Sequence, residues 1–259
     1  MGLFRSLTIG LFIIALPVAL ITTTIRVAIS EQAVYDYSVR HYGAEEASGI
    51  PESELIRANG EIRDYVTGGE GPLAITVTNL DGDEESLFNP RETVHMADVR
   101  DLVGAMFTVQ LISIALVLTL SVVMIALWPP RALAAACLYG GVLTAGALGA
   151  VGVVAVSGFD SAWSDFHGIA FTNDLWKLDP DTDHLIQMYP EAFWQRITLF
   201  LGAAILLQAL IVSAVASAYL ILTKPTEADF AEKPRPAVAG GPGHGRPRVA
   251  RPNPRHYVH

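Results

Sequence analysis

The stretch LVGAMFTVQLISIALVLTLSVVMIALW, residues 102–128, carries no charged side chain, and it decides the class of this protein. The hydrocarbon core of a bilayer is about 30 Å thick, and about 20 helical residues cross it. A second apolar run, ALAAACLYGGVLTAGALGAVGVVAV at residues 132–156, follows after only Pro129-Pro130-Arg131. Because the two prolines end the incoming helix and leave room only for a tight turn, we expect an antiparallel pair of membrane helices here. The glycines of the second run, among them Gly141, Gly146, Gly149 and Gly152, predict close packing against neighbouring helices and a central place in the bundle.

Two further runs, residues 7–29 and 197–222, are also long enough to cross a bilayer. Only 17% of the 259 residues are charged and 51% are hydrophobic, whereas a soluble domain averages about 25% charged residues. The first run could be a cleaved secretory signal, but a signal core is only about 7 to 15 residues long, so we expect a retained helix. The sequence therefore predicts an all-α polytopic membrane protein with four transmembrane helices and a small α+β extracytoplasmic cap.

The expected divisions of the chain follow from these runs. They are the N-terminus with the first transmembrane helix (1–29), the cap (30–101), the second helix (102–128), the third helix (132–156), a second extracytoplasmic loop (157–196), the fourth helix (197–222) and a basic cytoplasmic tail (223–259). The tail holds seven prolines and four glycines and is expected to be disordered, with its three histidines solvated.

The charged residues set the expected orientation. Arg5, Arg131 and seven basic residues of the tail would lie on one side of the membrane, against seven on the other. The segment 30–101 holds 16 acidic and 5 basic residues, and 157–196 holds 7 and 2. Because basic residues favour the cytoplasm, we expect both termini there and both loops outside. The net charge of −9 does not suit a nucleic-acid partner.

The first outer segment predicts a helix, a hairpin and a second helix. Leu55, Ala58, Ile62, Tyr65 and Val66 share a helical face, residues 73–78 alternate as a strand does, and Asp81-Gly82 turns the chain back. Asn89-Pro90-Arg91-Glu92 combines an N-cap residue, a first-turn proline and a glutamate at the third helical position. This second helix is expected to continue into the crossing at 102–128.

Two histidines are expected at one depth on the outer side of the membrane. His95 precedes the apolar residue Leu102 by seven positions, about 10 Å on a helix, and Asp98 shares its helical face and could hold its imidazole. His167 follows the third crossing closely, within an aromatic segment. An aromatic belt with two solvated histidines is the plain alternative. The convergence of two imidazoles with nearby carboxylates instead predicts a site for acid–base chemistry.

Other kinds of site are poorly supported. The run Asp179-Pro180-Asp181-Thr182-Asp183 lacks the glycine and the final glutamate of a calcium-binding EF-hand loop. There is no G-x-S-x-G nucleophile motif. The single cysteine, Cys137, lies in an apolar run, which excludes an internal disulfide and gives no reason for reactivity. No metal site and no cofactor are therefore expected.

Several short motifs accompany the two histidines. They are His95-Met96-Ala97-Asp98-Val99, Phe166-His167, Asn173-Asp174-Leu175-Trp176, Asp179-Pro180, Thr182-Asp183 and Pro190-Glu191-x-Phe193. In order and spacing they resemble the lipoprotein intramolecular transacylases and the wider group of bacterial four-helix membrane proteins that contains them. The sequence departs from the family at Gly168, where a glutamate is usual, and at His184, where proline is frequent.

The resemblance implies an acyltransferase of the bacterial plasma membrane, with its active site on the extracytoplasmic face. Its substrate would be a diacylglyceryl-modified lipoprotein embedded in membrane lipid, and an acyl chain would move from the glyceryl group to the α-amino group of the N-terminal cysteine. The family's two motif histidines fall on His95 and His167, so these are the expected catalytic residues. Asp98, Asn173, Asp174 and Asp165 are expected to support them, and Gly168 leaves open whether Asp165 or Asp174 orients His167.

Arg26, near the outer end of the first crossing, has two interpretations. Its side chain can extend to the lipid headgroups, or it can contact the substrate's polar linkage, Asp98 or Asp174. Two other functions also stay open for the whole chain: a membrane metallohydrolase that uses the histidines and aspartates as ligands, and a non-catalytic protein that binds lipid or a partner.

Overall fold

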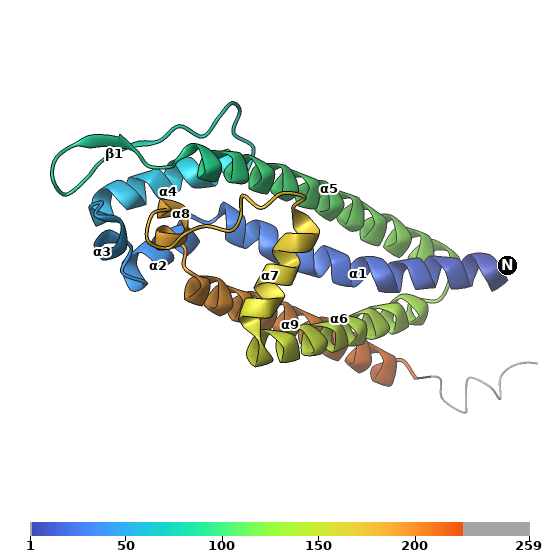
Figure 1. Ribbon diagram of the computed structural model, residues 1–259. Coiled ribbons are helices and arrows are strands. Elements are labelled where there is room, and N and C mark those ends of the chain that lie inside the picture. The colour runs from blue at the N-terminus through green and yellow to red at the C-terminus, as the bar shows by residue number, and fades with distance from the viewer. Residues whose placement is uncertain (1, 225–259) are drawn as a thin grey trace, which may run out of the picture. The chain divides into compact units, whose positions relative to one another are not determined.

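The computed structural model describes residues 2–224, apart from the side chains of residues 154–157. The expected disordered tail lies, from residue 225 onward, outside the described residues. Four helices are long and apolar enough to cross a membrane, which confirms the predicted fold class (Figure 1). They are α1 (Gly2–Ser30), α5 (Pro90–Leu127), α6 (Arg131–Ser157) and α9 (Glu191–Leu222).

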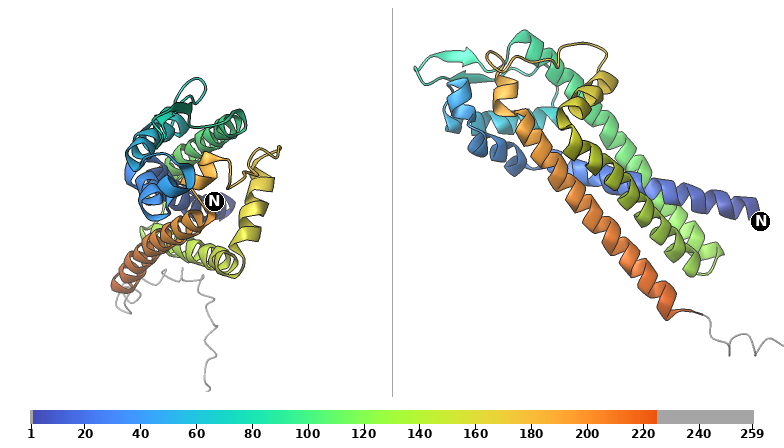
Figure 2. Two further views of the ribbon diagram at one scale, coloured as in Figure 1. Left: turned by 60° about the vertical axis from the view of Figure 1, so that its left-hand side comes forward. Right: turned by 60° about the horizontal axis from the view of Figure 1, so that its bottom comes forward.

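Helices α1 and α6 each pack against the other three long helices of this bundle, α1 most extensively against α5 and α6 most extensively against α9. Helices α5 and α6 share a buried cluster near the turn that joins them, through Met124 and Ala136, and then diverge (Figure 2). The sequence had suggested α6 as the central helix. The predicted close packing of this helix against a neighbour is observed at Gly141, where an added Cβ would lie 2.9 Å from the Ala209 carbonyl oxygen of α9. An added Cβ at Gly146, Gly149 or Gly152 would meet nothing within 4 Å.

The cap is built from short elements at one end of these helices. They are α2 (Gln32–His41), α3 (Ala44–Ser48), α4 (Glu52–Val66), β1 (Thr76–Thr78) and β2 (Glu84–Ser86). The expected helix is α4, and all five of its predicted apolar positions are buried. The strands form the expected antiparallel hairpin, with Val77 opposite Glu85. The strand is shorter than predicted, although Leu73 and Ile75 are buried before it.

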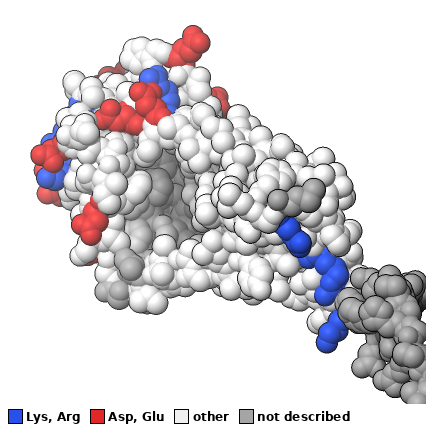
Figure 3. All heavy atoms as spheres, turned by 90° about the vertical axis from the view of Figure 1, so that its right-hand side faces the viewer, with Lys and Arg blue, Asp and Glu red and all other residues white. Residues whose placement is uncertain are grey.

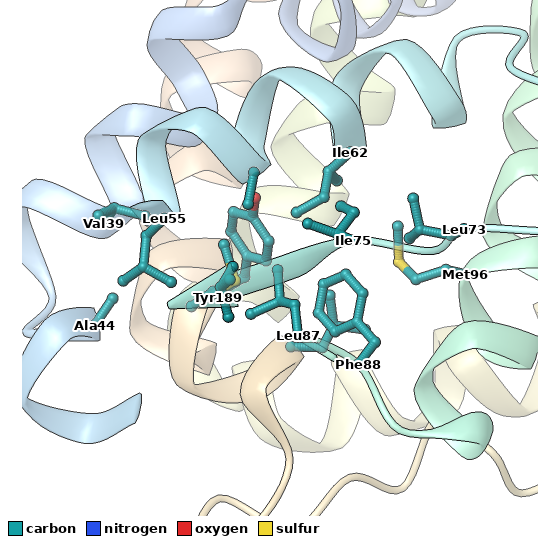
Figure 4. Close-up of a cluster of buried hydrophobic side chains, with 14 of the residues drawn as sticks. Val39, Ala44, Leu55, Ile62, Leu73, Ile75, Leu87, Phe88, Met96 and Tyr189 are labelled. Atoms are coloured by element: carbon teal, nitrogen blue, oxygen red, sulfur yellow. The ribbon is translucent and has the colours of Figure 1, made fainter. Parts of the chain in front are cut away.

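The second outer segment contains two helices that the sequence did not predict, α7 (Phe159–Ala170) and α8 (His184–Met188). Residues Leu185, Met188, Tyr189 and Phe193 from this part of the chain belong to the same buried cluster as the residues of α4 and the hairpin (Figure 4). The two outer segments therefore share one hydrophobic core. This shared core holds α8 and the start of α9 against the cap.

The N-terminus of α5 has the predicted capping box. The side-chain oxygen of Asn89 accepts hydrogen bonds from the backbone N–H groups of Arg91 and Glu92, and Glu92 accepts one from the N–H of Asn89. The other carboxylate oxygen of Glu92 accepts from the N–H of Leu185 at 2.7 Å. The buried Glu92 thus ties α8 to the start of the long helix. From this cap, α5 continues without interruption into its apolar part, as predicted.

Candidate active site

The two predicted histidines meet in the structure. His95 lies on the second turn of α5, His167 lies on the last turn of α7, and their ring centroids are 6.2 Å apart (the helices are labelled in Figure 1). Both are almost fully buried, with 5% and 7% of their surface exposed. They come from the two outer segments, so the site exists only because those segments pack together. The interpretation as a belt of solvated histidines is wrong.

A backbone carbonyl orients His167. Its Nδ1 lies 2.8 Å from the carbonyl oxygen of Trp163, one helical turn earlier. Because a carbonyl oxygen only accepts hydrogen bonds, Nδ1 carries the proton in the neutral ring and Nε2 carries the free lone pair. Burial lowers the pKa of His167 below its ordinary value, against the smaller opposite effect of this hydrogen bond. His167 is thus held neutral, with Nε2 ready to accept a proton.

His95 is held differently. Its Nδ1 is buried and has no hydrogen-bond partner among the described residues. Asp98, which the sequence suggested as its orienting group, instead accepts a hydrogen bond from the side-chain amide of Asn173 at 2.9 Å. A buried nitrogen without a hydrogen-bond partner costs free energy. A bound molecule can supply the missing partner at this position. His95 therefore has a hydrogen-bonding atom to offer to a substrate.

Aromatic side chains surround the pair. Trp163 and Trp176 lie on His167 with ring centroids at 4.4 and 5.0 Å, and Phe171 contacts both histidines at 5.0 and 5.6 Å. Trp194, at the start of α9, stacks on Trp163 at 5.2 Å. This enclosure excludes water and strengthens any charge interaction inside the site. The sequence showed the density of these aromatic residues but not that they cover the histidines.

The remaining predicted residues occupy different places. Asp174 is exposed and forms an ion pair with Lys177 at 2.7 Å. Asp165 is exposed as well. An added side chain at Gly168 would meet nothing within 4 Å. The carbonyl of Trp163 orients the ring of His167. Neither Asp165 nor Asp174 therefore takes the place of the glutamate that is usual in the family at position 168.

Arg26 lies apart from the histidines, between α1 and α5. It donates a hydrogen bond to the side-chain oxygen of Gln110 at 2.8 Å and lies over the ring of Phe107 at 4.3 Å. Phe107 follows His95 by twelve positions, about 18 Å along a helix. The expected contact of Arg26 with Asp98 or Asp174 is not observed. Among the described side chains, no group of three His, Cys, Asp or Glu residues gathers as a metal site would require.

Two residues of the site were missed by the sequence analysis, Arg91 and Trp176. Arg91 donates to backbone carbonyls of residues 174–177, and Trp176 of that segment covers His167. The spacing of Arg91, His95 and Asp98, four and then three positions apart, places all three on one stripe of the helix. This shared helical face was the signal in the sequence that could have placed Arg91 near the site.

Comparison with known proteins agrees with this arrangement. A protein of Aquifex aeolicus (strain VF5), described only as uncharacterized, is 24% identical over 203 residues, which is 76% of this chain and 88% of that protein. The lipoprotein intramolecular transacylase Lit of Bacillus cereus superposes with a TM-score of 0.70 at 19% identity, over 86% of this chain and 99% of that structure. A form of the same Bacillus cereus protein with a histidine-to-alanine substitution superposes with a TM-score of 0.69 at 17% identity, over 86% and 96%.

These structural similarities concern the fold. The family itself is shown by the sequence, because the family model for the lipoprotein intramolecular transacylase Lit matches residues 10–194, most of the part of the chain that the structure describes. The chain therefore belongs to the lipoprotein intramolecular transacylase family, and it is a membrane enzyme of the transacylase class.

Proposed function

We propose that His95 and His167 catalyse the transfer of an acyl chain from the diacylglyceryl group of a lipoprotein to the α-amino group of its N-terminal cysteine. The reaction takes place at the extracytoplasmic face of the plasma membrane. The observation that carries this proposal is the meeting of two buried imidazoles from separate outer segments, 6.2 Å apart. The substrate and the products are those of the family to which the chain belongs.

The first step needs a base. An α-amino group has a pKa near 8 and is mostly protonated at neutral pH, so one proton must pass to solvent before the neutral amine can attack an ester. As the amine nitrogen forms a bond to the ester carbonyl carbon, the lone pair on Nε2 of His167 accepts one of its two remaining protons, since Nδ1 donates to the Trp163 carbonyl. A tetrahedral intermediate with a neutral nitrogen and a negatively charged oxygen results.

The second step needs a donor for that oxygen and a proton for the leaving group. His95, whose Nδ1 has no partner among the described residues, donates a hydrogen bond to the charged oxygen. As the ester C–O bond breaks, the protonated His167 returns its proton to the departing glycerol oxygen. The proton that left the amine thus ends on the glycerol hydroxyl, and both rings regain their starting states.

No nucleophilic side chain is required by this scheme. The ester and the amine belong to one substrate molecule, so binding brings them together at a high effective concentration. The aromatic residues around the histidines exclude water, which would otherwise compete with the amine for the ester. Transfer to nitrogen is therefore favoured over hydrolysis.

The charge distribution supports the proposed location. Arg5 lies over Trp128, and Arg131 donates hydrogen bonds to Leu220 and Thr223, so both lie at the helix ends away from the cap. Figure 3 shows acidic side chains gathered at the other end of the molecule. By the positive-inside rule, this distribution supports an extracytoplasmic cap. Helix α7 presents Phe166 and Ile169 outward, the latter 87% exposed, as an interfacial helix does. The histidines would then lie at the depth of the lipid headgroups.

The test uses a bacterial host without lipoprotein N-acylation. The chain is expressed there, and the acyl positions on a lipoprotein's N-terminal cysteine are determined by mass spectrometry of the terminal peptide. We expect an N-acyl lyso-glyceryl peptide with the native chain and an unchanged diacylglyceryl peptide with His167→Gln at equal membrane abundance. A free amine on all terminal peptides despite good expression of the native chain would contradict the proposal.

A further inference from the structure

The stripe on α5 that carries His95 also holds the loop between α7 and α8. Arg91 lies one turn before His95, and Asp98 lies about one turn after it. Asp98 accepts a hydrogen bond from Asn173, the third residue after α7. Arg91 donates hydrogen bonds to three of the next four residues of the loop, Asp174, Leu175 and Lys177. The loop is therefore attached to α5 on both sides of the catalytic histidine.

The side-chain hydrogen bonds of Arg91 all go to backbone carbonyl oxygens. Its guanidinium donates to the carbonyls of Asp174 at 2.9 Å and Leu175 at 3.4 Å, and also to that of Lys177. These three carbonyls bracket Trp176. An ion pair between Asp174 and Lys177 closes the same turn at 2.7 Å. A planar guanidinium with five N–H donors suits three carbonyls that converge in this way, whereas an ammonium does not.

The position of Arg91 in the helix is electrostatically unfavourable. It lies in the first turn of α5, where the helix dipole is positive and acidic residues are preferred. None of the ion pairs among residues 2–224 includes Arg91. A stabilising role in the helix itself or in a surface ion pair does not explain the residue. Its described contacts point only to the loop.

The segment that Arg91 holds covers the proposed base. The ring of Trp176 lies on the imidazole of His167 at 5.0 Å and 30°, and adds to the enclosure that Trp163 and Phe171 provide. Lys177 lies over the same indole at 5.3 Å. Because residues 172–174 and 177 of this loop are exposed, the place of Trp176 over His167 depends on what fixes residues 174–177.

We propose that Arg91 is a positioning residue, which fixes residues 174–177 so that Trp176 covers His167 and keeps water from the reacting ester. This inference rests on the proposed function of His167. Arg91 does not touch the reacting atoms, so its effect passes through Trp176. Loss of its hydrogen bonds frees the loop and admits water to the ring, which lowers the rate of transfer and raises the pKa of His167 toward its ordinary value.

The experiment compares Arg91→Gln with Arg100→Gln. Arg100 is an arginine of the same helix that donates to the Gly71 carbonyl and to Asp101, away from the histidines. The purified chains are assayed on a synthetic diacylglyceryl lipopeptide in bilayer nanodiscs. We expect kcat to fall about tenfold with Arg91→Gln, with KM nearly unchanged, and to stay within about twofold of the native value with Arg100→Gln. Arg91→Lys should recover part of the loss, because it keeps one or two of the donors.

Two further measurements separate positioning from a general loss of structure. The imidazole of His167 is titrated by NMR in chains with ¹³C-labelled histidine, and its signal is assigned by its loss in His167→Gln. Its midpoint should move upward in Arg91→Gln and not in Arg100→Gln. In a chain that already carries Trp176→Ala, Arg91→Gln should lower kcat little further, because both changes remove the contact of Trp176 with His167.

The outcomes distinguish this inference from the proposed function. If His167→Gln retains the native rate, both are wrong. If His167→Gln is inactive while Arg91→Gln behaves as Arg100→Gln does in rate and titration, only the role of Arg91 is wrong. If Arg91→Gln lowers kcat in the Trp176→Ala chain by as much as it does in the native chain, the positioning role is likewise wrong.

Discussion

His167 can serve as a base because a backbone carbonyl, rather than a carboxylate, holds its Nδ1. A carboxylate partner would raise the pKa of the ring and favour the imidazolium. A carbonyl sets the same tautomer but raises the pKa less. Burial among the aromatic residues lowers the pKa of the ring and keeps it neutral. The absence of a side chain at Gly168 is therefore compatible with a working base.

The titration of His167 should reflect this environment. Burial lowers its pKa, so the neutral form should predominate at pH 6.5, where an exposed histidine is about half protonated. NMR titration of the labelled native protein should give a midpoint for His167 below 6.5. A midpoint for His167 at or above 6.5 would mean that water reaches the ring.

Removal of divalent metals should not affect transfer. The described side chains offer no third histidine, cysteine or carboxylate near the pair at metal-binding distance, so the mechanism relies on the imidazoles themselves. The rate of lipopeptide conversion should be equal, within error, before and after treatment with a chelator. Loss of activity that added zinc or calcium restores would support the metallohydrolase alternative instead.

At the scale of elements, the sequence predicted what local patterns determine. The capping signal at Asn89 and Glu92 and the apolar face of α4 were both confirmed, because each depends on neighbouring residues. Helices α7 and α8 were not predicted. Helix α8 has only five residues, and the aromatic residues of α7 fit a membrane interface in any conformation. Both helices are defined by packing against distant segments, which no local pattern reveals.

Asn89 is expected to contribute measurably to the stability of the cap. Its oxygen caps α5, and its amide nitrogen donates to Asp183 at 2.8 Å. Asn89→Ala should lower the free energy of unfolding by about 1 to 2 kcal/mol, measured by thermal denaturation in detergent. Asn89→Ser keeps a capping oxygen and should recover most of the cap's contribution. Equal stability of the native and Asn89→Ala chains would contradict this role of the capping box.

At the scale of the whole molecule, the meeting of His95 and His167 follows partly from topology. Each histidine adjoins the outer end of a membrane crossing, so the sequence could place both at one depth. Their lateral position was not predictable, because it depends on the shared core of Leu185 and Phe193 with α4 and on how the four long helices pack against one another. For the same reason the location of Arg26 beside Gln110, rather than beside the site, could not be foreseen.

The proposed orientation can be tested by chemical labelling. In a chain with Cys137→Ala, single cysteines are introduced at the exposed positions Asp81 and Lys224 and treated in intact spheroplasts with a membrane-impermeant maleimide. Asp81→Cys should react at once, and Lys224→Cys only after the membrane is made permeable, since the cap faces outward. The reverse pattern would place the histidines on the cytoplasmic side.

The most direct test of the two-histidine mechanism is a single-turnover measurement on the diacylglyceryl lipopeptide with His95→Gln, His167→Gln and the double variant. We predict that each single substitution lowers the rate by about 10² or more and that the double variant loses little beyond the His167→Gln value, because the two rings act on one intermediate. A near-native rate for either single variant, with the fold intact, would contradict the account.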